Sequence, residues 1–340
     1  MGMRVDKIRT LRRWPVFPEW AGSVPVVIDA HHHVWDLEAR EHRWLMGSQP
    51  WASDEELARL RRSFGLAELA PLAAASGVTG TVVVQTVTEP WETPDLLALA
   101  AGGAVPPGGA VPPGGAVPPG GAVPPGGRLL AGVVGWTDLA APSAADAVAG
   151  LRALPGGSFL CGIRHPLLTE PDPGWLARPL VVRGLAELAA AGLCFDLVLR
   201  PDQLPSAIGA ARSVPELTFV LDHLGGPPVG SPAESGAPGS WAATIRELGA
   251  LPNVVCKLSG AHSEPARASD LRPYYETVLA AFGPSRLMFG SDWPVSSLVA
   301  GYGQMRDLYL ELTADLGATE REAIFDGTAQ RVYRLGTAAD

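Results

Sequence analysis

Basic side chains are in short supply in this 340-residue chain, which holds 26 Lys and Arg against 35 Asp and Glu, for a net charge of −9. The sequence contains no basic stripe, so we expect no nucleic-acid partner. No apolar run approaches the roughly 20 residues that span a bilayer, so we expect no membrane partner either. The arginine-rich N-terminus also lacks the apolar stretch of a signal peptide, which predicts a cytoplasmic protein.

Cysteine is scarce as well. The three cysteines, Cys161, Cys194 and Cys256, each fall within a predicted strand, and none forms a CxxC pair. This pattern is typical of small buried apolar residues in a reducing compartment.

Eight apolar segments recur along the chain with helical patterns between them. Their centres, such as residues 81–84 and 254–256, are continuously apolar, as expected for parallel strands that are covered on both faces. This alternation, repeated eight times, predicts a (β/α)8 barrel. We expect strands at 24–33, 80–87, 128–138, 159–166, 193–200, 217–225, 253–260 and 286–294, and helices that include 65–76, 179–191, 202–212 and 269–282.

Two missing motifs exclude competing folds and chemistries. No glycine-rich phosphate loop follows the first strand, which disfavours an open doubly wound sheet. Ser259 lacks the nucleophile-elbow sequence around it, which disfavours a serine hydrolase.

The chain is predicted to form one domain with additions at three places. Residues 1–23 form an N-terminal extension, and residues 24–340 form a single barrel domain. Capping boxes at Ser53 with Glu56 and at Thr319 with Glu322 predict two helix starts. The second begins an additional helical pair, from about Thr319 to Leu335, that we expect to close one end of the barrel.

The third addition is a repeat at residues 104–127, which holds four copies of Ala-Val-Pro-Pro-Gly-Gly. Proline and paired glycines oppose regular structure, so we expect a flexible string of turns. It separates a predicted helix from the next strand, and in a barrel such junctions lie at the end opposite the chemistry. We therefore expect a tolerated surface insertion rather than a partner-binding element.

The sequence Val26-Val27-Ile28-Asp29-Ala30-His31-His32-His33 carries the first chemical signal. Because side chains alternate along a strand, His31 and His33 share one face and His32 takes the other. A second apolar strand, far downstream, ends in a carboxylate, Asp292. The first and last strands become neighbours only if the sheet closes, which would bring Asp292 against the histidine pair.

Polar side chains also lie at the carboxyl ends of most of the other predicted strands, where a parallel barrel places its reactive groups. Burying so many such groups is costly unless they pair or bind something. They are Arg164 and His165 on the fourth strand, Asp196 and Arg200 on the fifth, Asp222 and His223 on the sixth, and Lys257 and Ser259 on the seventh.

Four ordered blocks carry a family resemblance: residues 28–36 (IDAHHHVWD), 221–227 (LDHLGGP), 256–260 (CKLSG) and 289–294 (FGSDWP). Together they resemble the amidohydrolase superfamily, and specifically its amidohydrolase-2 type lactonases, which open sugar-acid or dicarboxylate lactones. The resemblance covers about residues 25 to 335. It implies a distorted (β/α)8 barrel and hydrolysis at the carboxyl ends of the strands.

The resemblance leaves the metal content open. Members with a metal commonly supply a histidine from strand 5, but strand 5 here contains Asp196 and ends at Arg200. No lysine suited to carboxylation ends strand 4, so a binuclear centre is not expected. One divalent ion, most naturally zinc, could be held by His31, His33 and Asp292, with His223 as a further candidate. A metal-free enzyme is the equal alternative.

A lactone is an activated ester, so its hydrolysis needs a base and a polarised carbonyl. Asp292 is the candidate base, and His31, His33 and His223 are the candidate catalytic neighbours that stabilise the oxyanion. Arg164, Arg200 and Lys257 are candidates to bind substrate hydroxyls or a carboxylate, with internal salt bridges as their alternative role. Trp35 and Trp293 lie at strand ends, as does Trp91, where their rings could stack on a sugar.

The leading hypothesis is thus a lactonase that acts on a small lactone or carboxylate substrate. A metal-dependent decarboxylase of the same superfamily is the second hypothesis. A non-catalytic sugar-acid binding protein is the third.

Overall fold

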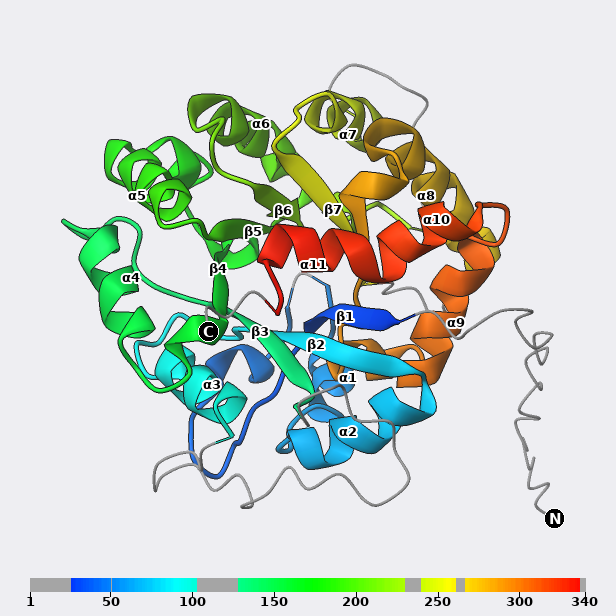
Figure 1. Ribbon diagram of the computed structural model, residues 1–340, viewed down its shortest axis with the longest axis horizontal. Helices are drawn as coiled ribbons and strands as arrows, with labels where there is room; N and C mark the ends of the chain where they lie inside the picture. Colours follow the sequence, from blue (N-terminus) through cyan, green and yellow to red (C-terminus); the bar gives the residue numbers. More distant parts are fainter. Residues whose placement is uncertain (1–25, 50, 103–127, 230–239, 261–266, 337–340) are drawn as a thin grey trace, which may run out of the picture.

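Eight parallel strands follow one another in sequence order around a barrel (Figure 1). The computed structural model describes residues 26–49, 51–102, 128–229, 240–260 and 267–336. The last strand returns to the first, because the Asp292 amide donates to the His31 carbonyl at 2.8 Å. The predicted (β/α)8 barrel is therefore confirmed. The strands are β1 (Val27–His32), β2 (Val78–Val84), β3 (Leu130–Gly135), β4 (Leu160–Pro166), β5 (Cys194–Val198), β6 (Phe219–Leu221), β7 (Val254–Leu258) and β8 (Leu287–Phe289).

Helices surround the barrel, and all four helices named from the sequence are present. The predicted N-terminal extension at 1–23 and the repeat at 104–127 lie outside the described residues. The helices are α1 (Asp54–Ala58), α2 (Leu66–Ala75), α3 (Glu92–Ala100), α4 (Ala144–Arg152), α5 (Pro179–Ala190), α6 (Leu204–Ser213), α7 (Trp241–Gly249), α8 (Ala268–Phe282), α9 (Tyr302–Leu312), α10 (Ala318–Glu322) and α11 (Thr328–Tyr333).

Most strands are shorter than predicted, chiefly at their carboxyl ends. After β6 and β8 the cause is the conformation of the backbone. After β6, His223 and Leu224 have φ values of +54° and +55°, and after β8, Asp292 has a φ of +56°. A left-handed residue cannot continue a strand, so the chain turns away at these points. The turns aim His223 and Asp292 across the end of the barrel instead of along it.

Two apolar clusters hold the barrel together. Side chains that alternate inward, including Ile28, Val82 and Met288, fill the barrel, and the outward-facing ones pack against the helices. The three cysteines are buried, as predicted, and Cys161 and Cys194 belong to the inner cluster.

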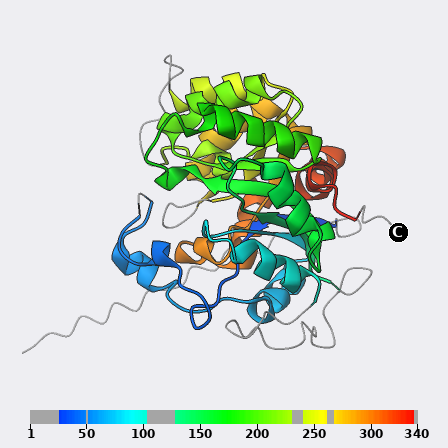
Figure 2. The ribbon, with the colours of Figure 1, turned by 90° about the vertical axis from the view of Figure 1, so that its left-hand side faces the viewer.

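The C-terminal segment closes the amino-terminal end of the barrel, as expected, but its details differ. It is one helical run, with a π-helical stretch, η9 (Ala323–Gly327), between α10 and α11, instead of a helical pair. Figure 2 shows it in red on the side opposite the blue segment that follows β1. The predicted capping box of Thr319 and Glu322 is wrong, because Glu320 accepts from the Gly317 amide at 2.8 Å and starts the helix earlier. The other box, at Ser53, is confirmed.

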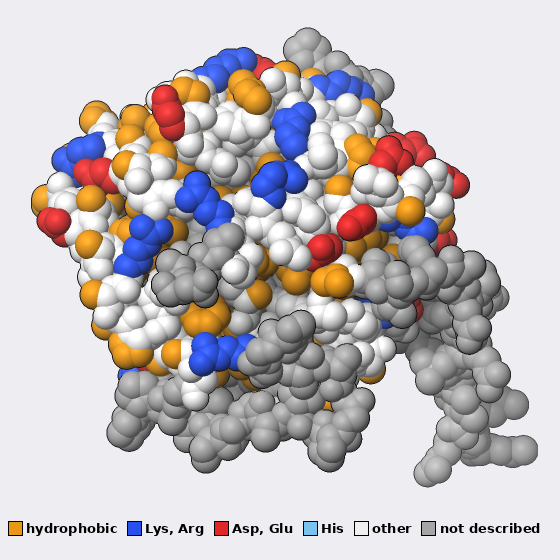
Figure 3. Space-filling view, viewed as in Figure 1, with side chains coloured by type: hydrophobic (Ala, Val, Ile, Leu, Met, Phe, Trp, Pro, Cys, Tyr) orange, Lys and Arg blue, Asp and Glu red, His pale blue; other side chains and the backbone are white. Residues whose placement is uncertain are grey.

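On the face covered by the C-terminal helices, basic side chains are separated by neutral surface (Figure 3). Among the described residues, no helix combines the length and the apolarity needed to cross a membrane.

Candidate active site

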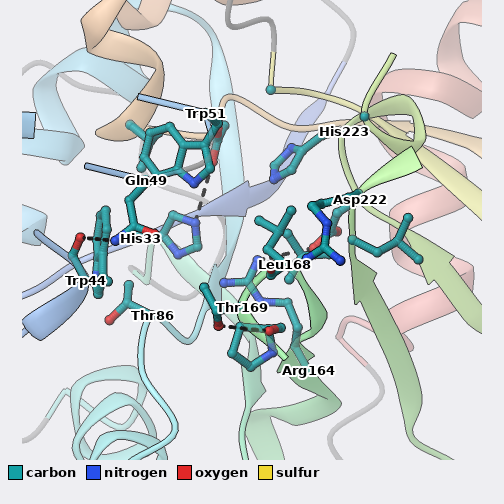
Figure 4. Close-up of a pocket in the computed structure, with 18 of the residues that line it drawn as sticks. His33, Trp44, Gln49, Trp51, Thr86, Arg164, Leu168, Thr169, Asp222 and His223 are labelled. Atoms are coloured by element: carbon teal, nitrogen blue, oxygen red, sulfur yellow. Dashed lines mark hydrogen bonds and ion pairs between the residues drawn. The ribbon is translucent and has the colours of Figure 1, made fainter. Parts of the chain in front are cut away.

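A cavity of about 1030 Å³ opens at the carboxyl ends of the strands. His33, Arg164, His223 and Asp292 come from strands on different sides of the barrel and line its inner end. In Figure 4, His33 and His223 lie near each other, with Arg164 below them. The sequence-predicted residues therefore meet at one place. The outer wall includes Trp44, Gln49, Trp51 and Trp91.

The histidines of β1 alternate as predicted. The Nε2 atoms of His31 and His33 are 3.2 Å apart, whereas His32 points the other way and places Nε2 3.0 Å from Oγ1 of Thr81. Burial lowers the pKa of His32 to about 3, so this ring is neutral. His31 is fully buried just beneath the cavity, and His33 lines it.

Asp292 lies against this pair, as the closed barrel requires. Its Oδ1 atom is 3.5 Å from Nε2 of His33 and 3.7 Å from Nε2 of His31. The left-handed turn after β8 and the amide bond to the His31 carbonyl hold the residue in place. A carboxylate beside two imidazoles, open to a cavity, can accept a proton from water and return it.

Asp29 anchors this turn and was not recognised from the sequence. Its carboxylate accepts from the Ser291 amide at 2.8 Å, the Ser291 hydroxyl at 2.6 Å and the Tyr302 hydroxyl at 2.9 Å. Burial raises its pKa to about 6, although these hydrogen bonds oppose the shift. The residue joins β1 to the turn that carries Asp292. Its position in the strand before two histidines was the available signal.

His223 is held at the cavity by the neighbouring strand. Its Nδ1 atom is 2.9 Å from Oγ of Ser259, and its ring centroid is 4.6 Å from that of His31. Ser259 therefore positions an imidazole, in line with the sequence argument against a serine nucleophile.

Four buried charged groups lie at the inner end of the site. The Lys257 ammonium contacts Asp196 at 2.6 Å and Asp222 at 3.0 Å, and Arg164 contacts Asp222 at 3.2 Å. Burial opposes the charge on Asp222, but Lys257, His31 and Arg164 hold its pKa well below the usual range. Burial raises the pKa of Asp196 to about 6. Lys257 lies beneath the cavity and does not line it.

Gln85 fixes the orientation of Arg164 and was also missed. Its side-chain Oε1 accepts from Nη2 of Arg164 at 3.0 Å, and its carbonyl accepts from the same nitrogen. With Asp222 on the other side, the guanidinium is held at the cavity wall from two directions.

The remaining predicted residues are placed differently. Arg200 lines the outer cavity and pairs with Asp202 at 3.1 Å. Trp35 and Trp293 are 4% and 3% exposed and are absent from the cavity lining among the described residues. Trp35 instead donates its indole N–H to the Arg62 carbonyl at 2.7 Å.

The donor atoms fit a metal ion. The three distances among Nε2 of His31, Nε2 of His33 and Oδ1 of Asp292 are 3.2, 3.5 and 3.7 Å. Tetrahedral zinc with bonds of 2.0–2.1 Å places its ligand atoms about 3.3 Å apart. Ligand atoms of His31, His223 and Asp292 also lie within 4.8 Å of one another. The site thus contains a candidate His/Asp metal cluster.

Sequence comparisons agree with this geometry. Residues 128–335 match the Amidohydrolase family, Amidohydro_2. The L-fucono-1,5-lactonase of Burkholderia ambifaria is 34% identical over 315 residues, which cover 91% of this chain and 95% of the relative. The L-fucono-1,5-lactonase of Burkholderia multivorans is 35% identical over 325 residues, which cover 92% and 97% of the two chains.

Solved structures extend the comparison. An amidohydrolase from Burkholderia multivorans, crystallised with bound zinc, superposes with a TM-score of 0.74 at 34% identity and covers 91% of this chain and 99% of its own. A 5-carboxyvanillate decarboxylase from Sphingomonas paucimobilis, with a TM-score of 0.56 and 14% identity, shares the fold alone. The barrel, the histidine and aspartate site and these relatives together show that the chain belongs to the amidohydrolase family.

Proposed function

We propose that the protein hydrolyses the lactone of a sugar acid and releases the open hydroxy acid. The observation that carries the proposal is Asp292, which faces a cavity beside His33 and His223 on a barrel whose 34–35% identical relatives are L-fucono-1,5-lactonases. The outer wall offers apolar ring faces of the kind on which sugar rings stack, from Trp44, Trp51 and Trp91.

The charge of the cavity favours a neutral lactone over a carboxylated one. Each arginine of the lining has an acidic partner: Arg43 with Glu41 at 3.1 Å, Arg164 with Asp222 at 3.2 Å and Arg200 with Asp202 at 3.1 Å. Among the described lining residues, Glu89 and Asp292 add two further acids. An anionic substrate would enter a metal-free cavity with an excess of negative charge, whereas a hydroxylated neutral ring would find donors and acceptors.

The reaction follows from the positions of these side chains. Asp292 takes a proton from water while the water oxygen attacks the lactone carbonyl carbon. Arg164 and His223 share the inner end of the cavity, where their N–H groups can stabilise the oxyanion. The ring C–O bond then breaks, and the protonated Asp292 returns its proton to the departing alkoxide oxygen. Water and lactone thus become one hydroxy acid.

The site would hold one divalent ion, zinc by preference, through His31, His33 and Asp292. Such an ion, when bound, polarises a carbonyl or acidifies a water molecule. Without it, Asp292 still provides a base and Arg164 and His223 still provide N–H donors, so hydrolysis in a metal-free enzyme is the alternative form of the proposal.

The test is a panel of neutral aldonolactones that includes L-fucono-1,5-lactone, with a carboxylated lactone of equal ring size as the matched control. Acid release is followed with a pH indicator, with and without chelator or added zinc. The proposal predicts turnover of neutral lactones and a far lower kcat/KM for the carboxylated one. Carbon dioxide release from aromatic acids would point to the decarboxylase, and binding without turnover to a sugar-acid binding protein.

A further inference from the structure

Glu92 is a buried carboxylate that the proposed mechanism does not use. It is the first residue of α3, and it is 3% exposed. Its Oε1 atom accepts from the Thr86 amide at 2.7 Å and from the Thr86 hydroxyl, and its Oε2 atom accepts from the Val87 amide at 2.9 Å. Both carboxylate oxygens are therefore occupied by donors of the loop between β2 and α3.

The peptide group between Gln85 and Thr86 is held from both sides. Its N–H donates to Glu92, and its carbonyl, which belongs to Gln85, accepts from Nη2 of Arg164. This peptide is trans, since the one cis peptide bond among the described residues is Trp293-Pro294. The N–H and the C=O of a planar trans peptide point in opposite directions. The peptide thus lies between a carboxylate on one side and a guanidinium on the other.

The sheet does not fix the orientation of this peptide. The Gln85 amide still donates to the Val134 carbonyl of β3 at 2.9 Å, but the peptide that follows it makes no bond to a strand. If that peptide rotated, its N–H would face Arg164 in place of its carbonyl, and two donors would oppose each other. The carboxylate of Glu92 therefore holds the peptide in the orientation that presents an acceptor to the guanidinium.

The charges at the two ends of this arrangement attract each other. Burial raises the pKa of Glu92 to about 7, whereas the hydrogen bonds from Thr86 and Val87 and the charge of Arg164 oppose the shift. A chain of hydrogen bonds polarises its members in one direction. The carboxylate thus makes the Gln85 carbonyl a stronger acceptor for Arg164, which lines the cavity together with Thr86 (Figure 4).

We propose that Glu92 is a positioning residue for Arg164. Through the peptide between Gln85 and Thr86, its carboxylate holds the guanidinium at the cavity wall, where Arg164 can donate to the oxyanion formed from the lactone carbonyl. Asp222 holds the same guanidinium from the other side, through Nη1 at 3.2 Å. The kinetic part of this inference rests on the proposed hydrolysis, whereas the connection between the two charged groups does not.

The first test is Glu92→Gln, which keeps the size of the side chain but has one acceptor oxygen and no charge. Only one of the two main-chain amides then finds an acceptor, so the peptide is held less firmly. At pH 8, we expect kcat for a neutral aldonolactone to fall about tenfold with KM within about twofold, because the oxyanion exists only in and after the transition state. An unchanged kcat would overturn the proposal.

The matched control is Thr93→Val, at the next residue of α3. The Thr93 side chain is also buried and also holds a loop, since its hydroxyl accepts from the Trp136 amide at 2.7 Å and donates to the Trp136 carbonyl at 2.9 Å. Trp136 is absent from the cavity lining among the described residues. We expect this variant to keep kcat within about twofold, and a loss equal to that of Glu92→Gln would contradict the proposal.

A double-variant cycle separates positioning from a general structural role. In the Arg164→Met background, Glu92 has no guanidinium to position. We therefore expect Glu92→Gln to change kcat in that background by less than about twofold. A further tenfold loss, on the order of that seen in the wild-type background, would overturn the proposal.

The readout that needs no turnover is the Nε–H group of Arg164 in the full-length protein labelled with ¹³C and ¹⁵N, assigned through its own side-chain carbons. We expect its proton to exchange with water about fivefold faster or more in Glu92→Gln, and at the wild-type rate in Thr93→Val. Equal exchange in the wild type and Glu92→Gln would overturn the connection even in an active lactonase. An absence of lactonase activity would instead refute the proposed function and leave this measurement readable.

Discussion

Gly260 follows β7 at the cavity and makes room for the His223 ring. It has a φ of +66°, and a Cβ atom built on it would lie 2.5 Å from Cγ of His223 and 2.6 Å from its Cβ. Ordinary contact begins near 3.4 Å, so Gly260→Ala has to move the imidazole by about 1 Å. That shift would break the 2.9 Å contact between Nδ1 of His223 and Ser259.

The chain offers a matched control in Gly283. Its φ is +68°, almost the same as that of Gly260, but nothing lies within 4 Å of its built Cβ. An alanine is strained at either of these positive φ values, by roughly 1–3 kcal/mol. Only Gly260→Ala has to displace a catalytic side chain.

We expect Gly260→Ala to reduce kcat for lactone hydrolysis by about 100-fold, the usual cost of a 1 Å displacement. We expect Gly283→Ala to keep kcat within about twofold although it loses thermal stability. The assay is steady-state acid release, with thermal unfolding of both variants at one pH. Wild-type kcat in a folded Gly260→Ala variant would refute the role of His223 and the close contact between Gly260 and its ring.

Three further predictions concern other parts of the molecule. Burial raises the pKa of Glu92 to about 7 from 4.5, so its protonated form stabilises the fold at low pH, and this contribution is lost as the pH rises through 7. Between pH 4.5 and 8, the free energy of unfolding of the wild type, measured with denaturant, should fall by about 3 kcal/mol relative to that of Glu92→Gln. Parallel pH profiles of the two unfolding free energies would contradict this prediction. Trp51→Ala should raise KM about tenfold with kcat little changed, and an unchanged KM would remove Trp51 from the substrate wall. Deletion of residues 104–127 should leave kcat and KM within about twofold, since β3 begins shortly after them at the end of the barrel opposite the cavity; a large loss of kcat would contradict that placement.

The sequence predicted the parts of the site that depend on strand periodicity. Alternation along β1 was enough to place His31 and His33 on one face, because side-chain direction in a strand follows directly from sequence order. The position of Asp292 followed from the eight-strand count, since only a closed barrel joins its strand to β1. These inferences needed no knowledge of loops.

Contacts between distant loop and core residues were not predictable in the same way. Trp35 was expected to stack on substrate, but its indole is turned into the loop that follows β1. The backbone amide of Trp35 donates a hydrogen bond to the Phe64 carbonyl of this loop at 3.0 Å. Nothing in the order of residues indicates that the loop folds back there. The wall tryptophan Trp44 comes from the same loop and was missed for the same reason.

The buried polar partners were missed because each pair is far apart in the chain. Asp29 is hydrogen-bonded to Ser291, and Asp196 to Tyr333, so the residues of each pair meet only in the folded barrel. Lys257 was expected either to bind substrate or to form an internal salt bridge, and the salt bridge is the role that the structure shows. Its paired acids on β5 and after β6 keep it beneath the cavity.

The central claim is that Asp292 is the base for lactone hydrolysis, and Asp292→Asn tests it most directly. The amide keeps the shape of the side chain but cannot accept the proton of water. The account predicts a folded protein with nearly unchanged KM for a neutral aldonolactone and a kcat lower by about 10³-fold. A folded Asp292→Asn variant that retains kcat within about tenfold of the wild type would contradict the account.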